Sequence, residues 1–491
     1  MTDYSSWDAT EIQRRIAGGE LQPIEAVEAA VSAIEAVNPK LNAVVHRMYD
    51  AARAAAVGPL PAGPLSGVPM VVKDFDGFVK GVPFTASTSF LQEFVPDHDA
   101  EAIARLRRAG AVFLAKTNLP ELAIFGTTES RFRGACRNPW NLAHSTGGSS
   151  GGSAALVAAR AVPVAHGGDG GGSLRIPASA CGVVALKPSR GRVPMGPDQG
   201  EGWGGYVQWG GLTRSVRDTA LLLDVMSGPI PGDLYAAPTP ERPFVQEPGT
   251  PPGKLRIAFS GTSLFGKATD PACLAALDAA VVLLRGLGHQ VEEARPSFNR
   301  DKMVRAYLTQ VGVSIAAEMD EMSRWTGKPL DPQHFEPATW FLSQVGRVIR
   351  GTELQEARDA AAEASQILAE FHTRWDLFLT PTLAYPPIVI GELAPKPAEL
   401  FGLAVLRTLP IEKGIRAVLA ELAANSLERT PNTMLFNQTG QPAISLPLGM
   451  SPAGLPLGIQ LVAPYGHEAR LLQIAAQIEE AAPWEGRRPT L

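Results

Sequence analysis

A dense run of glycine and serine over residues 145–192 constrains this chain more than any other feature. The run reads STGGSSGGSAALVAARAVPVAHGGDGGGSLRIPASACGVVALKPSRGR. Glycine lets backbone N–H groups approach a ligand or another strand closely, and it permits φ > 0. Because so much glycine weakens local order, its presence indicates a functional loop. Two serines, Ser149 in GGSSGG and Ser173 in GGGS, flank the Ala/Val-rich run 154–161, which we predict to be a buried helix.

Lys73 follows the short apolar run 68–72, which reads as a buried strand. Lysine at the end of a buried strand is unusual. Burial disfavours the charged form of an amine, so we expect Lys73 to act as a neutral general base. From this stretch alone, the alternative is a surface lysine paired with Asp74.

The two glycine-flanked serines supply the other groups that amide hydrolysis requires. The reaction needs a nucleophile, a path for its proton, donors for the oxyanion and an acid for the leaving amine. Consecutive N–H groups of Gly170, Gly171, Gly172 and Ser173 can form a nest that points at one oxygen. This arrangement favours Ser173 as the nucleophile and Ser149 as a proton relay to Lys73.

The same run resembles the amidase signature family of serine hydrolases, whose core motifs are GGSSGGS, GTDTGGSIRxPA and GxxGxKPTxG. Their counterparts here are residues 147–153, 167–178 and 182–191. The resemblance implies a catalytic lysine, a serine after a cis peptide, a nucleophilic serine and an acyl-enzyme intermediate, at Lys73, Ser149 and Ser173. Gly168 and Gly170 stand where the family usually has threonine, and we expect Gly170 to loosen the loop beside the nucleophile.

Strands alternate with helices along the chain, which indicates an α/β fold with a largely buried, mixed sheet. The resemblance to the amidase signature family implies a large mixed β-sheet covered by helices on both faces. We therefore predict a single domain, 1–491, with its signature core at about 66–225. The Pro-rich stretch 229–252 is the alternative domain boundary. Helical segments at about 299–372 and 393–430 do not match the signature and are candidates for walls or a lid of the substrate pocket.

Substrate contacts are predicted on loops around the core. The loop at 121–125 contributes Ala123, Ile124 and Phe125, and the Gly-rich loop at 195–211 carries Trp203 and Trp209. Val311 aligns with a pocket residue of a resembling enzyme. Arg175 is expected to pair with Asp169 and hold the nucleophile loop.

Further segments match one branch of the family, which hydrolyses small, uncharged, non-peptide amides. They are RNPWNL, RSVRD, QPAISLPLGM and QIEEAAPW. The resemblance implies an amidase for cyclic or linear amide oligomers. Carbamates (urethanes), aryl acylamides and esters stay open as substrates, because the same acyl-transfer machinery would serve them.

Three other readings remain. Residues 147–151 fit G-x-S-x-G, but the nucleophile elbow of an α/β-hydrolase follows a strand, and NPWNLAHST reads as a loop. His144 and His166 would be the bases of such a Ser-His-Asp triad. A phosphate-binding loop would need GK[ST] or GxGxxG after a strand, and neither is present. An amidotransferase subunit, working with a partner protein, belongs to the same family and stays open.

Composition and charge limit the kinds of molecule that this protein is expected to bind. The net charge of −5 has interspersed signs, which argues against a nucleic-acid partner. No apolar run is long enough to span a membrane, and no secretory signal is visible, so we expect a cytoplasmic protein. Three cysteines without a CxxC pair indicate neither a disulfide framework nor a metal site. We therefore predict a small-molecule substrate, no cofactor and no metal, with a homodimer as the hypothesis for the assembly.

Overall fold

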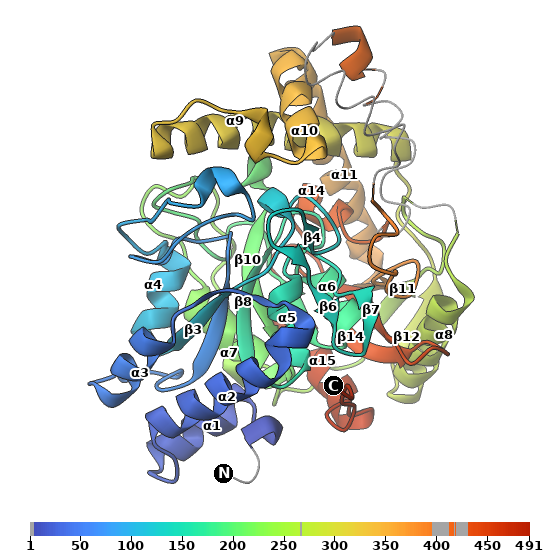
Figure 1. Ribbon diagram of the computed structural model, residues 1–491. Coiled ribbons are helices and arrows are strands. Elements are labelled where there is room, and N and C mark those ends of the chain that lie inside the picture. The colour runs from blue at the N-terminus through green and yellow to red at the C-terminus, as the bar shows by residue number, and fades with distance from the viewer. Residues whose placement is uncertain (1–3, 266–267, 395–411, 417, 419–430) are drawn as a thin grey trace.

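The computed structural model describes residues 4–265, 268–394, 412–416, 418 and 431–491. Over this part of the chain a mixed 11-stranded sheet forms the centre, in the order β1-β3-β2-β8-β10-β9-β14-β15-β13-β11-β12. Figure 1 shows helices packed around this sheet. Two short ribbons, β4–β5 and β6–β7, lie outside it.

The sheet strands are β1 (Val44–Arg47), β2 (Pro69–Lys73), β3 (Val112–Thr117), β8 (Val164–Asp169), β9 (Val184–Lys187), β10 (Gln208–Thr213), β11 (Arg256–Phe259), β12 (Gln290–Glu293), β13 (Leu377–Pro381), β14 (Ala443–Met450) and β15 (Pro456–Val462). The ribbon strands are β4 (Glu129–Ser130), β5 (Gly134–Ala135), β6 (Arg137–Asn138) and β7 (Asn141–Ser145). Parallel pairs join β3, β2 and β8 at one end and β13, β11 and β12 at the other, and antiparallel pairs join the strands between.

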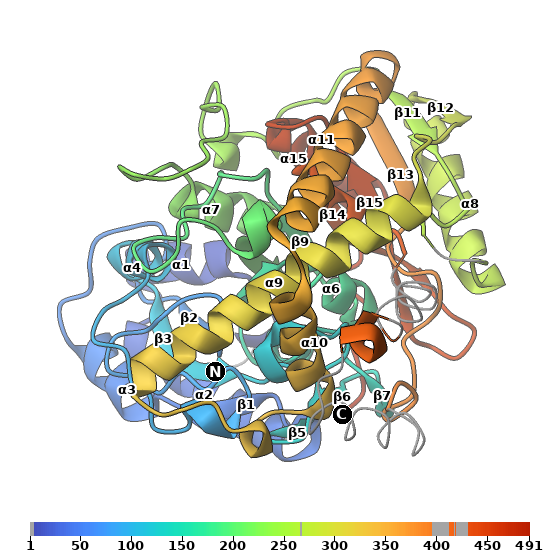
Figure 2. The same ribbon diagram turned by 90° about the horizontal axis from the view of Figure 1, so that it is seen from above.

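The helices are α1 (Ala9–Ala17), α2 (Pro23–Leu41), α3 (Tyr49–Val57), α4 (Glu101–Arg108), α5 (Gly151–Ala158), α6 (Arg175–Cys181), α7 (Val216–Met226), α8 (Pro271–Gly286), α9 (Arg300–Thr326), α10 (Pro337–Val348), α11 (Gly351–Arg374), α14 (Leu435–Thr439) and α15 (Glu468–Ala481). Figure 2, seen from above, shows α9 as a long helix that runs across the molecule, and α10 and α11 pack against it.

Alternating side chains of the C-terminal strands enter two different cores. In β13, Leu377 and Leu379 pack with residues of α8 and α15, whereas Phe378 packs with residues of α11 and α14. Successive strand side chains point to opposite faces, so a strand that is apolar at every position needs cover on both. The predicted class, a large mixed sheet covered by helices on both faces, is confirmed.

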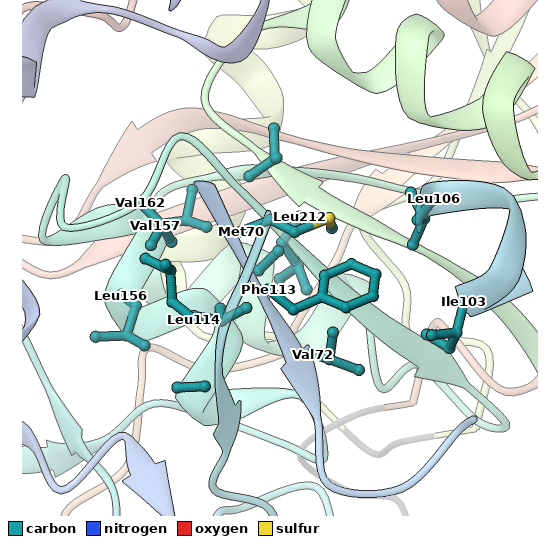
Figure 3. Packing of buried hydrophobic residues seen from close by; sticks show 14 of the residues in the cluster. Met70, Val72, Ile103, Leu106, Phe113, Leu114, Leu156, Val157, Val162 and Leu212 are labelled. Atoms are coloured by element: carbon teal, nitrogen blue, oxygen red, sulfur yellow. The ribbon is translucent and has the colours of Figure 1, made fainter. Parts of the chain in front are cut away.

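The N-terminal half of the sheet packs in the same way. Figure 3 shows this part of the core, where Phe113 of β3 and Met70 of β2 lie among apolar side chains from α4 and α5. Leu156 and Val157 of α5 are fully buried. The Ala/Val-rich helix predicted at 154–161 is therefore present, but it begins at Gly151 and ends at Ala158.

The Gly-rich stretch at 195–211 is not entirely the loop that we expected. Its last residues belong to β10, which pairs with both β8 and β9 in the middle of the sheet. A Cβ atom at Gly210 would lie 2.8 Å from Leu174, and one at Gly211 would lie 2.3 Å from Leu222. Leucine side chains from neighbouring elements thus occupy the space over these glycines. This packing is tertiary and overrides the low strand propensity of glycine.

The segment NPWNLAHST, also expected to be a loop, contains β7 and part of β6. These strands pair with each other in a ribbon and not with the central sheet. A strand therefore does precede GGSSGG, but it is not the sheet strand on which a nucleophile elbow is built.

The segment predicted at 393–430 lies mostly outside the described residues. The division of the chain into a single domain with a core at about 66–225 stays a prediction. Among the described helices, none is both long and apolar enough to cross a membrane.

The start of α5 offers a test of why the run needs glycine. A Cβ atom at Gly152 would lie 2.5 Å from the Asn118 nitrogen and 2.6 Å from the Ala43 oxygen, both backbone atoms. Gly152→Ala should therefore lower the free energy of unfolding by about 1–3 kcal/mol, measured by chemical denaturation. Gly286→Ala in α8, where nothing lies within 4 Å, is the matched control and should be neutral or slightly stabilising. Equal effects of the two substitutions would contradict the role of close packing.

Candidate active site

One cavity of about 420 Å³ brings together the three residues that were predicted to be catalytic. Lys73, Ser149 and Ser173 all line it. Lys73 comes from the end of β2, Ser149 from the turn before α5 and Ser173 from the turn between β8 and α6. The strands β2 and β8 are parallel neighbours, so their carboxyl ends lie at the same edge of the sheet and bring Lys73 and the turn that carries Ser173 together.

Lys73 and Ser149 are joined by a hydrogen bond. The Lys73 Nζ donates to the Ser149 Oγ at 2.8 Å, and the lysine is only 1% exposed. The Gly148–Ser149 peptide bond is cis. Lys73 is therefore not the surface lysine of the alternative reading, and its amine faces the hydroxyl that the relay hypothesis requires.

Asp76 is an acidic neighbour of the lysine that sequence reasoning did not include. The Lys73 Nζ forms an ion pair with the Asp76 carboxylate. Asp74, the partner of Lys73 in the alternative surface reading, instead accepts a hydrogen bond from Thr85 and lies 3.6 Å from the Lys116 Nζ. Sequence reasoning therefore missed the carboxylate that the structure places beside the Lys73 amine.

Ser173 is 9% exposed at the cavity wall. Over the described residues, no hydrogen bond joins its Oγ to the Ser149 Oγ. Catalytic hydrogen bonds are often absent without substrate and tighten when it binds. The predicted relay from Ser173 to Ser149 would need such a hydrogen bond to form when substrate binds.

The loop before Ser173 is pinned by a buried ion pair, as expected for Arg175 and Asp169. The Arg175 Nε lies 2.9 Å from the Asp169 Oδ2, and both side chains are fully buried. Asp169 also accepts a hydrogen bond from the Gly172 N–H at 2.7 Å. The Gly172 N–H is thus occupied and is not free for an oxyanion, which corrects the predicted nest and leaves the N–H groups of Gly170, Gly171 and Ser173 as candidates.

The two glycines that replace threonine make room for other side chains. A Cβ atom at Gly168 would lie 2.4 Å from the Asp76 Cγ, and one at Gly170 would lie 2.8 Å from the Trp203 ring. Neither glycine has a positive φ. Gly170 therefore does not loosen the loop, because the Trp203 indole fills the space that a threonine would occupy.

The predicted substrate contacts are only partly at the cavity. Ala123, Trp203 and Trp209 line it, whereas Ile124, Phe125 and Val311 are not among the lining residues. Val311 is buried in the core, and Phe125 is exposed at the surface. Within 121–125, residues Glu121–Ala123 form a 3-10 helix, and of the three predicted contacts on this turn only Ala123 lines the cavity.

Most of the remaining wall was not predicted residue by residue. It includes aromatic side chains after β2 and polar side chains on α9, namely Phe75, Phe78, Phe84, Gln310, Ser314, Glu318 and Glu321. The α9 residues recur at helical spacing of three and four, which places them on one face of the helix. That spacing was the available signal, but nothing in the sequence indicates which face of α9 meets the cavity.

Neither histidine near the motif supports a Ser-His-Asp triad. His144 and His166 do not line the cavity. Burial lowers the pKa of His166 to about 3, and the nearby Lys116 and Lys73 act in the same direction. This imidazole is therefore neutral, and it is buried on β8 outside the lining of the cavity that holds both serines.

The sequence model of the amidase family matches residues 25–472. This chain belongs to the amidase family and is an amide-cleaving hydrolase.

Relatives extend the likeness over the whole length. The 6-aminohexanoate-cyclic-dimer hydrolase of Pseudomonas sp. (strain NK87) is 41% identical over 501 residues, covering 100% of this chain and 98% of that protein. The solved structure of 6-aminohexanoate cyclic dimer hydrolase complexed with substrate superposes with a TM-score of 0.90 at 39% identity, covering 99% of each chain. A bacterial aryl acylamidase of the amidase signature family has a TM-score of 0.86 at 27% identity, covering 98% of this chain and 99% of that one.

Gly168 offers a test of the space that Asp76 occupies. Gly168→Ala should displace the Asp76 carboxylate and disturb Lys73, so we expect kcat to fall about tenfold or more for a small amide, measured by steady-state kinetics. Asp76→Ala removes the clashing group. Adding Gly168→Ala to Asp76→Ala should therefore cost little further activity. Additive losses in the double variant would show that the glycine serves another purpose.

Proposed function

We propose that Ser173 is the nucleophile, Ser149 the proton relay and Lys73 the base of this amidase. The observation that carries the proposal is the 2.8 Å hydrogen bond from the Lys73 Nζ to the Ser149 Oγ, in the cavity that Ser173 also lines. A hydroxyl that lies between an amine and a second hydroxyl can accept a proton from the second hydroxyl while it gives its own proton to the amine. The proposed roles use side chains and backbone groups, so the chemistry calls for no cofactor and no metal.

In the first half of the reaction, the Ser173 Oγ forms an ester bond with the amide carbon. Its proton moves to Ser149 as the proton of Ser149 moves to Lys73, whose amine accepts it in the neutral form. The N–H groups of Gly170, Gly171 and Ser173 stabilise the oxyanion. The C–N bond then breaks, and the same relay, run in reverse, protonates the leaving nitrogen. Water hydrolyses the acyl-enzyme with Ser149 and Lys73 again as the base.

The substrates that we propose are small, uncharged amides, including cyclic or linear amide oligomers such as the 6-aminohexanoate cyclic dimer. Two features support this choice. Relatives named for that substrate match the whole chain. The cavity is also lined by the aromatic side chains of Phe75, Phe78, Trp203 and Trp209, which suit an uncharged aliphatic chain.

Aryl acylamides are the second candidate, because a bacterial aryl acylamidase shares the fold over nearly the whole chain. Carbamates and esters follow from the same acyl-transfer chemistry. An amidotransferase subunit stays an alternative prediction, and a tightly co-purifying partner protein would support it. A cytoplasmic location and a homodimer complete the proposal.

Covalent labelling tests the proposed nucleophile. A fluorophosphonate should modify Ser173, as located by peptide mass spectrometry, and Ser173→Ala should abolish both the label and amide hydrolysis. Lys73→Ala should lower kcat by roughly 10²–10⁴-fold, because the base is lost. Lys187→Met is the matched control, since Lys187 is an equally buried lysine whose Nζ donates to the Pro188 oxygen, away from the cavity. A label on another serine would overturn the assignment.

A substrate panel tests the proposed specificity. Purified enzyme should hydrolyse the 6-aminohexanoate cyclic dimer with a higher kcat/KM than an aryl acylamide, a carbamate or an ester of similar size, measured by product chromatography. The Ser173→Ala variant serves as the blank for spontaneous hydrolysis. A preference for the aryl acylamide or the carbamate would reassign the substrate class but keep the triad.

A further inference from the structure

Glu318 is an acidic side chain in the active-site cavity that the mechanism above does not use. It lies on α9 and lines the cavity together with Ser173. Its Oε1 accepts a hydrogen bond from the Trp203 Nε1 at 3.0 Å. Its Oε2 is buried and has no hydrogen-bond partner among the described residues. A buried acceptor without a partner is costly, and such a group in a binding cavity is often completed by the ligand.

The basic side chains of the cavity are already paired with other acids. Lys73 pairs with Asp76, Arg324 with Glu321, and Arg358 lies 3.9 Å from Glu201. A further acid of the wall, Asp198, contacts His98. Over the described part of the chain, Glu318 is therefore the acid of this cavity that has no basic partner. The arrangement leaves one carboxyl available to pair with a cation that comes with the substrate.

The position of this carboxyl is tied to the nucleophile loop. The Trp203 indole, which donates to Glu318, packs over Gly170, where a Cβ atom would lie 2.8 Å from the ring. Gly170 directly precedes the Gly171–Ser173 segment. A threonine at this position would displace the indole and with it the hydrogen bond that orients the carboxyl. The glycine that departs from the family pattern thus builds the place that Glu318 occupies.

We propose that Glu318 is an amine-binding subsite, which holds a primary amino group on the acyl part of the substrate. The inference rests on the proposed function and extends its substrates from uncharged amides to amides whose acyl chain ends in an amine. The subsite also gives Glu318 a role in the hydrolysis of cyclic amides, because opening of the ring produces a primary amine on the acyl chain.

Ring opening creates that amine inside the cavity. When the Ser173 Oγ forms its ester bond and the ring C–N bond breaks, the leaving nitrogen stays attached to the acyl chain. A tethered amine can attack the ester again and close the ring, because intramolecular attack is strongly favoured over attack from solution. The neutral amine takes the proton of the Glu318 carboxyl and becomes an ammonium paired with a carboxylate. An ammonium has no lone pair for attack, so water completes the hydrolysis.

The protonation state of Glu318 suits this transfer. Burial raises the pKa of the Glu318 carboxyl to about 8, and the nearby Asp76 acts in the same direction against the hydrogen bond from Trp203. At neutral pH the empty carboxyl is therefore protonated and can give its proton to an alkyl amine, whose ordinary pKa is about 10. For a substrate that arrives as an ammonium, binding should strengthen as pH rises through 8, because the carboxyl then loses its proton without the ligand.

The test compares two acyl p-nitroanilides that differ in one charge, 6-aminohexanoyl-p-nitroanilide and its N-acetyl derivative. The wild-type enzyme should favour the amine, and Glu318→Gln should lose about tenfold or more of kcat/KM for the amine with the N-acetyl compound unchanged. Glutamine keeps the shape and an acceptor for Trp203. Glu321→Gln is the matched control, because Glu321 lies one turn further along α9 in the same cavity and is already paired with Arg324.

Binding without turnover separates this inference from the proposed function. Calorimetry on Ser173→Ala, with and without Glu318→Gln, should show tighter binding of the amine than of the N-acetyl compound only when Glu318 is present, and the difference should grow as pH rises through about 8. Equal binding of the two compounds, or an equal loss of both in Glu318→Gln, would overturn the subsite. Absence of hydrolysis of either compound by the wild-type enzyme would count against the proposed function instead.

Discussion

The buried ion pair between Arg175 and Asp169 is the interaction on which the catalytic arrangement depends. Burial alone would raise the pKa of the Asp169 carboxyl. The guanidinium of Arg175 outweighs this effect and lowers that pKa to about 2. The Arg175 Nη atoms also donate to the Thr433 oxygen, the Gln460 Oε1 and the Asn437 Oδ1. A charge buried this deeply is costly without its partner. The loop that carries Ser173 is therefore held in one conformation by groups from the other end of the chain, and the proposed chemistry relies on this order.

Glycine serves two different purposes around this loop. Some glycines let backbones touch, as where Gly152 of α5 meets the backbone of Asn118 and Ala43. Gly168 and Gly170 instead leave space that side chains from elsewhere fill, Asp76 beside the lysine and the Trp203 indole over the loop. The space left by these two glycines changes which acids lie in the cavity. It admits Asp76 next to Lys73, and it admits the Trp203 indole that donates to Glu318. Two small residues that depart from the family pattern thus bear on which charged groups lie in the cavity.

Much of the site could be predicted from the chain alone, because its chemistry is concentrated in contiguous motifs. The placement of Lys73, Ser149 and Ser173 at one cavity agrees with what GGSSGG, GGGS and the lysine after an apolar strand suggested. The pairing of Arg175 with Asp169 was equally readable from their spacing and opposite charge. The cavity wall was not, since α9 meets the loops only after the sheet has formed, and Ile124, Phe125 and Val311 lie elsewhere as a result. Strand β10 was missed because leucines from other elements cover its glycines, which local propensity does not register.

Patterns carried by neighbouring residues were enough to predict the class of fold, the family and the three residue types of the proposed triad. Tertiary structure alone decided that Asp76 and not Asp74 contacts Lys73, that the Gly172 N–H is occupied, and that Glu318 faces the cavity without a basic partner among the described residues. These outcomes depend on close packing between segments far apart in the chain. Contacts of a few ångströms between such segments follow from the whole packed arrangement and leave no periodic or local signal to read.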